Sequence, residues 1–350
     1  MTGAAAARSE SSDALVVAPP LRIALIGNPN TGKSTLFNAL TGMRVRVGNF
    51  PGVTVERVEG TLKGTAPGER VTILDLPGCY SLTPASPDEE VALAALHGTR
   101  DGMRPDAVLV VADAAQLERN LFLVSQVLEL GLPVVVALNQ IDAAADAGIT
   151  VDPVELIHAL GVPVIPTIAT RGEGIDTVRR ALVAATTHAV PSRRFALAPD
   201  VQEALEPFER HLAVAQGVVP AVATLDALRL LAAPRVESWY ADPATLEKEL
   251  DEARIRIAST GANPRSIEAA LRYAWIGEVV ARCTTRRAGT RRSLSDRIDA
   301  VALHRVWGPV LFVAIMAIVF QGIFSWAAPL QDGIEAFVAA VGDAIGAALP

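Results

Sequence analysis

The stretch GNPNTGKS, residues 27–34, carries the pattern G-x-x-x-x-G-K-[ST] and decides the fold of the chain around it. An apolar run, residues 21–26, precedes it, and a helical pattern, residues 33–40, follows it. In such a setting the glycines let the backbone turn closely, and N–H groups of the loop and the helix start converge on phosphate oxygens. The stretch therefore predicts a P-loop, with Lys33 on the β- and γ-phosphates and Ser34 on Mg²⁺.

Outward from this loop, apolar runs alternate with helical patterns as far as about residue 187. The expected strands are short, apolar and largely β-branched, as strands buried on both faces are; they cover residues 21–26, 71–74, 107–111, 134–138 and 162–165. Pro163 indicates that the last run is either an edge strand or the start of a strand. The expected helices cover residues 33–40, 89–96, 121–130, 153–160 and 175–185. This alternation predicts an α/β P-loop GTPase domain, a mostly parallel sheet with helices on both faces.

A second motif, DLPG at residues 75–78, stands at the end of an expected strand. The carboxylate of Asp75 can hold Mg²⁺ through water, and the N–H group of Gly78 can sense a γ-phosphate. A Ras-like enzyme carries a water-positioning glutamine just after that glycine. Cys79 stands there instead, and we expect it to be a small packing residue rather than a nucleophile. Slow intrinsic hydrolysis is therefore expected.

The switch segment VGNFPGVTVE, residues 47–56, lies between these two motifs. Thr54 is the expected switch threonine, whose hydroxyl meets Mg²⁺ only when the γ-phosphate is present. Thr41 competes for this role but lies too close to the end of the P-loop helix. The expected catalytic residues are therefore Lys33, Thr54 and Gly78, and the expected Mg²⁺ ligands are Ser34, Thr54 and Asp75.

A third motif, NQID at residues 139–142, follows the expected strand 134–138 and resembles the guanine-specificity motif of translation-factor-like GTPases. The carboxylate of Asp142 can accept hydrogen bonds from guanine N1–H and the 2-amino group, and adenine offers neither donor. Residues 168–170 are expected to contact the base through backbone groups. The expected nucleotide-binding residues, for GTP or GDP, are Gly27, Asn28, Asn30, Thr31, Gly32, Lys33, Ser34, Thr35, Asn139, Asp142, Ala169 and Thr170.

Composition limits the other classes of function. The chain has 350 residues, 51% of them hydrophobic, which excludes a wholly disordered protein and favours two or three domains. A formal net charge of -7 and an aromatic content of 5% argue against a nucleic-acid partner. Two cysteines cannot build a disulfide scaffold.

The composition changes along the chain and predicts its domain order. Helical patterns cover residues 201–213, 225–231, 245–259 and 266–282, without strand-like runs. The expected domains are a disordered tail (1–20), a GTPase domain (21–190), a helical spacer domain (191–282), a basic juxtamembrane linker (283–305), a transmembrane helix (306–331) and a last segment (332–350).

The membrane prediction depends on the uncharged run at residues 306–331. A helix of about 19 residues spans roughly 28 Å, close to the hydrocarbon thickness of a bilayer. Arginines before the run place the GTPase and helical domains in the cytoplasm, by the positive-inside rule. The last segment is expected to be an amphipathic or second membrane segment, because its three acids fall within an arc of about 80°. One span makes a poor transport path, so we expect the chain to be a fragment of a longer membrane protein.

Longer matches resemble one family. GNPNTGKSTLFNALTG, RVGNFPGVTVERVEG, DLPGCYSL, DAAQLERNL, ALNQID and ATRGEGI occur in the order found in the cytoplasmic G domain of FeoB, the ferrous iron transport protein B family. Residues 296–329 resemble that family's entry into its first membrane helix. The middle pair of the guanine motif is Gln140-Ile141, where many relatives have Met-Leu; we expect this pair to point away from the base.

The resemblance implies a GTPase coupled to a membrane region that imports Fe²⁺ across the bacterial inner membrane. It also implies that Asn30 matches an asparagine that helps to ligate K⁺ in potassium-activated members, where K⁺ would neutralise developing charge much as an arginine finger does. The expected cofactors are GTP or GDP, Mg²⁺ and K⁺. The expected partners are the lipid bilayer, Fe²⁺ as the transported ion, small accessory transport proteins and a second copy of the chain.

A second reading of the sequence stays open: a membrane-anchored regulatory GTPase switch that carries no ion. Era-like ribosome-assembly GTPases share the core motifs, but the acidic balance and the uncharged run count against a soluble, ribosomal version. The iron prediction rests on the family resemblance alone. Further apolar spans in the downstream reading frame would favour transport.

Overall fold

The computed structural model describes residues 21–43, 45–51, 53–64, 70–84, 86–99, 104–185, 196–217, 220–286, 301–322 and 327–348. The chain divides into two compact units, Met1–Arg287 and Ala288–Pro350. The predicted tail, residues 1–20, and most of the predicted linker, residues 283–305, lie outside the described residues.

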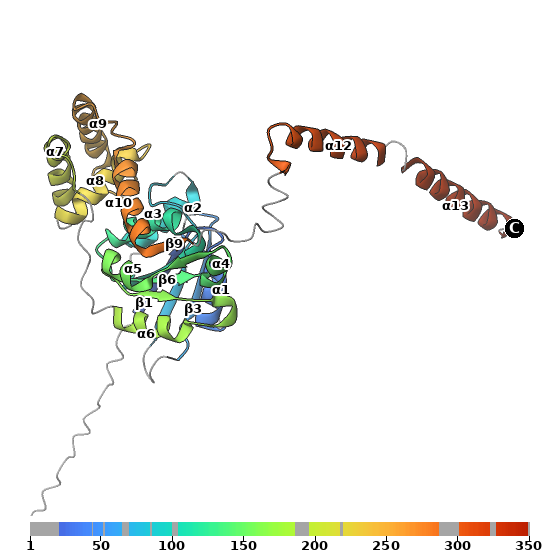
Figure 1. The fold of residues 1–350 in the computed structure, drawn as a ribbon, viewed down its shortest axis with the longest axis horizontal. Coiled ribbons are helices and arrows are strands. Elements are labelled where there is room, and N and C mark those ends of the chain that lie inside the picture. The colour runs from blue at the N-terminus through green and yellow to red at the C-terminus, as the bar shows by residue number, and fades with distance from the viewer. Residues whose placement is uncertain are drawn as a thin grey trace, which may run out of the picture. The chain divides into compact units, whose positions relative to one another are not determined.

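A seven-stranded sheet forms the centre of the first unit, with the strand order β2-β3-β4-β1-β5-β6-β8 (Figure 1). Its strands are β1 (Leu21–Gly27), β2 (Val45–Asn49), β3 (Glu56–Thr61), β4 (Val71–Asp75), β5 (Ala107–Asp113), β6 (Val134–Asn139) and β8 (Val164–Pro166). The pairs from β4 through β1, β5 and β6 to β8 are parallel, and those of β2 with β3 and β3 with β4 are antiparallel. The five parallel strands confirm the predicted ones, and β8 starts directly after Pro163, as the proline requires.

Helices cover both faces of this sheet, as predicted. Side chains of β1 alternate between the two faces: Ile23 and Leu25 pack with α1 (Lys33–Thr41) and α6 (Ile175–Ala185), in one core. On the other face, Ala24 and Ile26 belong to the core that includes α2 (Pro87–His97), α3 (Leu117–Leu128) and α5 (Pro153–Leu160). Helix α2 begins two residues before the predicted start because the hydroxyl of Ser86 caps it, accepting from the Glu89 N–H group at 3.3 Å.

The strands that were not predicted are β2 and β3, at one end of the large sheet, and the two strands of a second, smaller sheet. Every residue of β2 is exposed, so this strand has no buried face to produce an apolar pattern. The predicted switch segment, residues 47–56, begins within β2 and ends at the first residue of β3, and its loop connects these two strands. A second sheet pairs β7 (Ile149–Val151) with β9 (Thr284–Arg286), and the short helix α4 (Ile141–Asp146) precedes β7.

Four helices follow the sheet domain: α7 (Pro199–Gln216), α8 (Pro220–Ala232), α9 (Pro243–Ser259) and α10 (Ile267–Cys283). Prolines stand at the starts of α7 and α9, where the fixed φ suits a first turn. Helices α7, α8 and α9 share a hydrophobic core of their own. Figure 1 shows them gathered as a bundle beside the sheet domain, with α10 against α3.

A buried polar cluster joins α10 to the sheet domain. The guanidinium of Arg272 donates to Glu129 at 2.7 Å and to Glu268 at 2.9 Å. Gln126 of α3 donates to Glu268 at 2.8 Å, and its side-chain oxygen accepts from the N–H group of Leu82 at 2.6 Å. The loop that follows the DLPG motif is thereby tied to the same cluster.

The second unit contains α12 (Trp307–Gln321) and α13 (Ala327–Ala348). Large apolar side chains are exposed along both helices. Among the helices that the structure describes, none combines the length and the apolar composition needed to cross a bilayer. The predicted span, residues 306–331, includes residues 323–326, which are outside the described part.

Candidate nucleotide-binding site

The P-loop follows β1, at the edge where the parallel strands end. Gly27 is the last residue of β1, and a Cβ there would approach the Val111 carbonyl oxygen to 2.7 Å. Asn30 and Gly32 both have left-handed backbones, with φ of 68° and 82°. Gly32 caps α1, so the predicted phosphate ligands Lys33, Ser34 and Thr35 are the first residues of that helix. Their free N–H groups form the positive end that favours an anion.

The predicted phosphate and magnesium residues meet at the bottom of this loop. The ammonium group of Lys33 forms a close ion pair with the carboxylate of Asp75, at the end of β4, and each side chain is only 14% exposed. Burial raises the pKa of the Asp75 carboxyl, and the charge of Lys33 only partly offsets this. A buried carboxylate of this kind gains from a cation beside it.

The loop after β4 lies against the P-loop, as the motif predicts. The N–H group of Cys79 donates to the Gly27 carbonyl at 3.3 Å. A Cβ on Gly78 would lie 3.5 Å from the Gly27 oxygen and from the Pro29 nitrogen. Cys79 itself is buried, and burial raises the pKa of its thiol to about 12. The thiol is therefore protonated at neutral pH, and its place in the buried core agrees with the prediction of a packing residue.

The two candidate switch threonines differ in their surroundings. Thr41 is fully buried and donates its hydroxyl to the Phe37 carbonyl at 2.9 Å, so it serves the helix. Thr54 is exposed in the loop between β2 and β3. In the described part of the chain, no hydrogen bond joins Thr54 to the P-loop. Among the described residues, the contacts thus do not bring Thr54 to the other expected site residues.

The side chain of Asn139 connects three loops of the site. It ends β6, is 3% exposed and donates from Nδ2 to the Thr31 carbonyl at 2.8 Å. Its Oδ1 atom accepts from the Thr167 hydroxyl at 3.2 Å and from the Ala169 N–H group at 3.1 Å. One buried amide therefore holds the P-loop, the NQID loop and the loop after β8 together.

Asp142 stands in the first turn of α4, beside the loop after β8. Its carboxylate lies 3.6 Å from the guanidinium of Arg171, the last residue of the short helix η2 (Ala169–Arg171). Both side chains are partly exposed, so the pair contributes little to stability and can separate. The predicted base-contacting residues Asp142, Ala169 and Thr170 are thus brought to one place.

Two residues of the site, Thr167 and Arg171, were not singled out from the sequence, and Gln140 was named there only as a residue expected to point away from the base. Gln140 donates from Nε2 to the Asn30 carbonyl at 2.9 Å, so its side chain turns to the P-loop. Its place within NQID was the available signal, because two adjacent amides can reach two adjacent carbonyls.

Asn28, another of the predicted nucleotide-binding residues, is buried, and neither polar atom of its side chain has a hydrogen-bond partner among the described residues.

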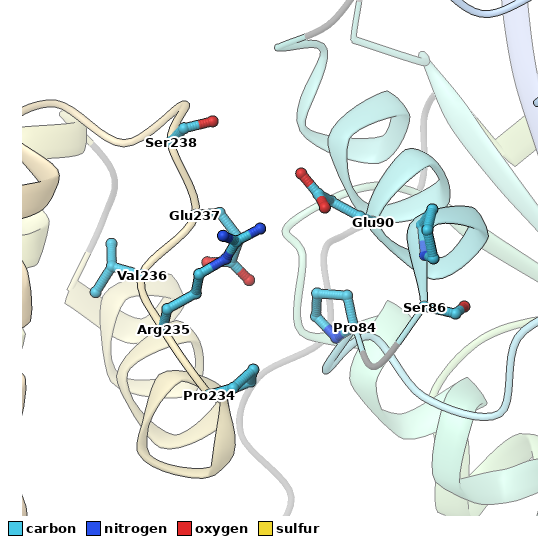
Figure 2. Close-up of a pocket in the computed structure, with 9 residues that line it drawn as sticks. Pro84, Ser86, Glu90, Pro234, Arg235, Val236, Glu237 and Ser238 are labelled. Carbon is cyan, nitrogen blue, oxygen red and sulfur yellow. The ribbon is translucent and has the colours of Figure 1, made fainter. Parts of the chain in front are cut away.

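A separate hollow lies away from these residues. It has a volume of about 530 Å³ and lies between the start of α2 and the segment joining α8 to α9. In Figure 2, Glu90 projects toward the segment that carries Arg235 and Ser238. None of the predicted nucleotide-binding residues lines it, so we do not assign it to the nucleotide.

The sheet order, the P-loop on β1 and the three motif loops at the strand ends define a P-loop GTPase G domain, followed by a helical region. The sequence pattern of the family described as ferrous iron transport protein B matches residues 21–182. The chain belongs to this family, FeoB.

Relatives of the chain carry the same family name. The Fe(2+) transporter FeoB of Escherichia coli (strain K12) is 36% identical over 311 residues, which are 86% of this chain and 38% of that protein. A fusion of Fe(2+) transport protein A with FeoB, from Porphyromonas gingivalis, is 32% identical over 351 residues, covering 94% of this chain and 40% of the fusion. The chain thus spans about two fifths of the length of these curated relatives.

A solved relative supports the assignment of the site. The GDP-bound crystal structure of a variant of the S. thermophilus FeoB G domain superposes with a TM-score of 0.64 at 37% identity. The match covers 76% of this chain and all of that one.

Proposed function

We propose that the chain is the GTP-binding and GTP-hydrolysing cytoplasmic part of a bacterial ferrous iron transporter, with GTP-driven switch changes that gate or drive Fe²⁺ uptake. The observation that carries the nucleotide role is the Asn139 amide, which joins the P-loop to both base loops. The iron role is supported by the FeoB family and by the name of the E. coli relative.

Binding of GTP would redirect two ion pairs. Lys33 would turn from Asp75 to the β- and γ-phosphates, and the N–H groups of Thr31, Gly32, Ser34 and Thr35 would cradle the phosphate oxygens. Asp142 would exchange Arg171 for the N1–H and 2-amino groups of guanine. We assign catalytic roles to Lys33, Thr54 and Gly78, whose groups would order around the γ-phosphate.

The residues fit a magnesium ion and a potassium ion. Ser34, Thr54 and Asp75 would hold Mg²⁺, because hydroxyl and carboxylate oxygens are the donors that it prefers and because Asp75 is a buried acid. Asn30, whose side chain is exposed on the P-loop, would supply an amide oxygen to K⁺. The ions would supply positive charge against the phosphates.

We propose the domain boundaries given above: a tail (1–20), a GTPase domain (21–190), a helical domain (191–282), a linker (283–305), a membrane helix (306–331) and an amphipathic or second membrane segment (332–350). The exposed apolar side chains of α12 support the membrane assignment. On this proposal the GTPase and helical domains face the cytoplasm at the inner membrane, and the lipid bilayer is a partner.

Two further partners are proposed. The P. gingivalis fusion supports an accessory protein of the Fe(2+) transport protein A type. A second copy of the chain is proposed as an oligomer partner, because most protein oligomers are built from copies of one chain.

The first test is GTP hydrolysis by the chain in KCl and in NaCl, with Asn30→Ala as the matched variant. We expect faster turnover in KCl and no such stimulation in Asn30→Ala. Equal rates of the unaltered chain in the two salts would exclude the potassium role and leave GTP binding intact.

The second test addresses the base and the transported ion. Asp142→Asn should weaken GDP binding and strengthen binding of xanthosine diphosphate, which carries a carbonyl where guanine carries its 2-amino group. In the full-length transporter, Lys33→Ala should abolish Fe²⁺ uptake into cells or vesicles. Undiminished uptake by that variant would exclude a role for GTP in transport.

A further inference from the structure

Arg119, in the first turn of α3, stacks on Tyr80, which stands two residues after the DLPG motif. The guanidinium carbon of Arg119 lies 4.1 Å from the centre of the Tyr80 ring. Both side chains are exposed, that of Tyr80 by 41%. A guanidinium over an aromatic ring is attracted by the negative face of that ring. The contact therefore ties the loop after β4 to the start of α3.

The stretch DAAQLERNL builds the helix start on which Arg119 stands. The carboxylate of Asp113, the last residue of β5, accepts from the Ala115 N–H group at 2.8 Å and from the Gln116 amide at 3.3 Å. The amide of Asn120, which is buried, donates to the Gln116 carbonyl at 2.8 Å. These hydrogen bonds fix the short turn between β5 and α3, so Arg119 is presented from a well-anchored position.

Helix α3 holds the same loop at a second point. The side-chain oxygen of Gln126 accepts from the Leu82 N–H group at 2.6 Å. Gln126 follows Arg119 by seven positions, close to two helical turns, so both stand on one face of α3. Gln126 is buried and also donates to Glu268, whereas Arg119 is exposed. Arg119 can therefore be changed without opening the buried cluster.

Gly78 depends on such neighbours for its position. It has no side chain, and Pro77 before it has no N–H group to donate. The hydrogen bond from the Cys79 N–H group to the Gly27 carbonyl is long, at 3.3 Å, and holds the loop only weakly. The stack of Tyr80 on Arg119, one residue further along, is the next contact that keeps this part of the loop in place.

We propose that Arg119 is a positioning residue for GTP hydrolysis: by stacking on Tyr80 it holds the loop after β4 along α3, with Gly78 beside the P-loop. This inference rests on the proposed role of Gly78 at the γ-phosphate. It gives the stretch DAAQLERNL a function that is separate from binding of the base and from the contacts of α3 with the helical region.

The test is the steady-state hydrolysis of GTP by the full chain, with kcat and KM measured separately. Arg119→Gln removes the cation, and Tyr80→Leu removes the ring. Each should lower kcat about 2- to 5-fold, the value of one exposed cation–π contact. The KM for GTP and the affinity for GDP should stay unchanged, because neither side chain is among the predicted nucleotide-binding residues.

Conservative variants separate this contact from a general loss of structure. Arg119→Lys keeps a cation and Tyr80→Phe keeps the ring, so both should retain most of the original kcat. The double variant Arg119→Gln with Tyr80→Leu should be no slower than either single variant, because both remove the same contact. Arg210→Gln, on the exposed side of α7, removes an arginine elsewhere and should leave kcat unchanged.

Three results would overturn the proposal. One is an unaltered kcat in Arg119→Gln or in Tyr80→Leu. Another is a double variant whose loss equals the product of the two single losses, because the two side chains would then act independently. The third is a fall in GDP affinity as large as the fall in kcat, which would indicate general damage to the site. If the unaltered chain hydrolysed no GTP, the proposed catalytic role of the site itself would fail, a result distinct from these.

Discussion

The guanidinium of Arg272 on α10 lies 2.7 Å from the carboxylate of Glu129, the residue that directly follows α3, and their side chains are 1% and 6% exposed. Although burial alone would lower the pKa of Arg272, Glu129 and Glu268 raise it, so the arginine stays charged. The helical region is thus joined to the GTPase domain by buried charge as well as by apolar packing.

Removing this arginine should destabilise the chain strongly. Arg272→Met leaves two carboxylates buried without their cation, and breaking a buried pair in this way costs about 3–5 kcal/mol. The control is Arg210→Met, because the pair of Arg210 with Glu206 is exposed and should contribute less than about 1 kcal/mol. Urea unfolding measures both, and equal losses for the two variants would contradict the prediction.

Gly32→Ala should disrupt the nucleotide site. A Cβ on Gly32 would meet the Asn139 Nδ2 atom at 2.4 Å, and φ is 82°. We expect the Asn139 side chain to shift and GDP affinity to fall at least about tenfold, the equivalent of one lost hydrogen bond of about 1.4 kcal/mol. Gly217→Ala is the control, because its φ is 63° but nothing lies within 4 Å of the added carbon. Calorimetric titration with GDP compares the two, and normal affinity in Gly32→Ala would refute the role of this close approach.

The stability of the chain should depend on pH through His97, the last residue of α2. Its Nε2 atom is buried without a hydrogen-bond partner among the described residues. Burial lowers the pKa of His97; Asp226 opposes this shift, and Arg229 and Arg104 add to it. The unfolded chain then binds this proton more readily, so the contribution to stability is complete above pH 6.5 and is lost as the pH falls below it.

A histidine variant isolates this effect. His97→Gln should flatten the fall in unfolding free energy below pH 6.5, which for one proton has a slope of at most about 1.4 kcal/mol per pH unit. His158→Gln, on the exposed side of α5, serves as the control. Parallel pH profiles for His97→Gln and the unaltered chain would rule out the assignment.

Cys79 should resist alkylation in the native chain. Its buried thiol has a pKa raised to about 12, so thiolate is scarce at neutral pH and the sulfur is shielded. We expect iodoacetamide at pH 7.5 to modify Cys79 only after unfolding, as peptide mass analysis would show. Cys79→Ala should keep GTP hydrolysis, and loss of hydrolysis with intact folding would show that the thiol does more than pack.

The parallel strands were predictable because burial on both faces makes a strand apolar throughout, as in Ala107–Asp113, where every residue is buried. The exposed edge strand β2 carries no such pattern. Strands β7 and β9 are three residues each and are far apart in sequence, so only the fold brings them together. Prediction from local pattern cannot supply such a pairing.

Much of the site was predictable for a related reason. Gly32, Lys33 and Asn139 stand at fixed distances from strand ends, and parallel strands bring those ends to one edge. The direction in which Gln140 points was not predictable, because it depends on a left-handed backbone and on a carbonyl more than a hundred residues away in sequence.

The pairing of β7 with β9 has a mechanical consequence. The chain leaves the GTPase domain after α6 and returns with α10; directly after α10, at Thr284–Arg286, three residue pairs of an antiparallel ladder attach it to the strand that follows α4. Tension on the polypeptide beyond Arg286 would thus act first on β7, which follows the NQID loop and α4 in the chain. Helices α7 to α9 lie between α6 and α10 in the chain, outside this path, and would carry none of the load.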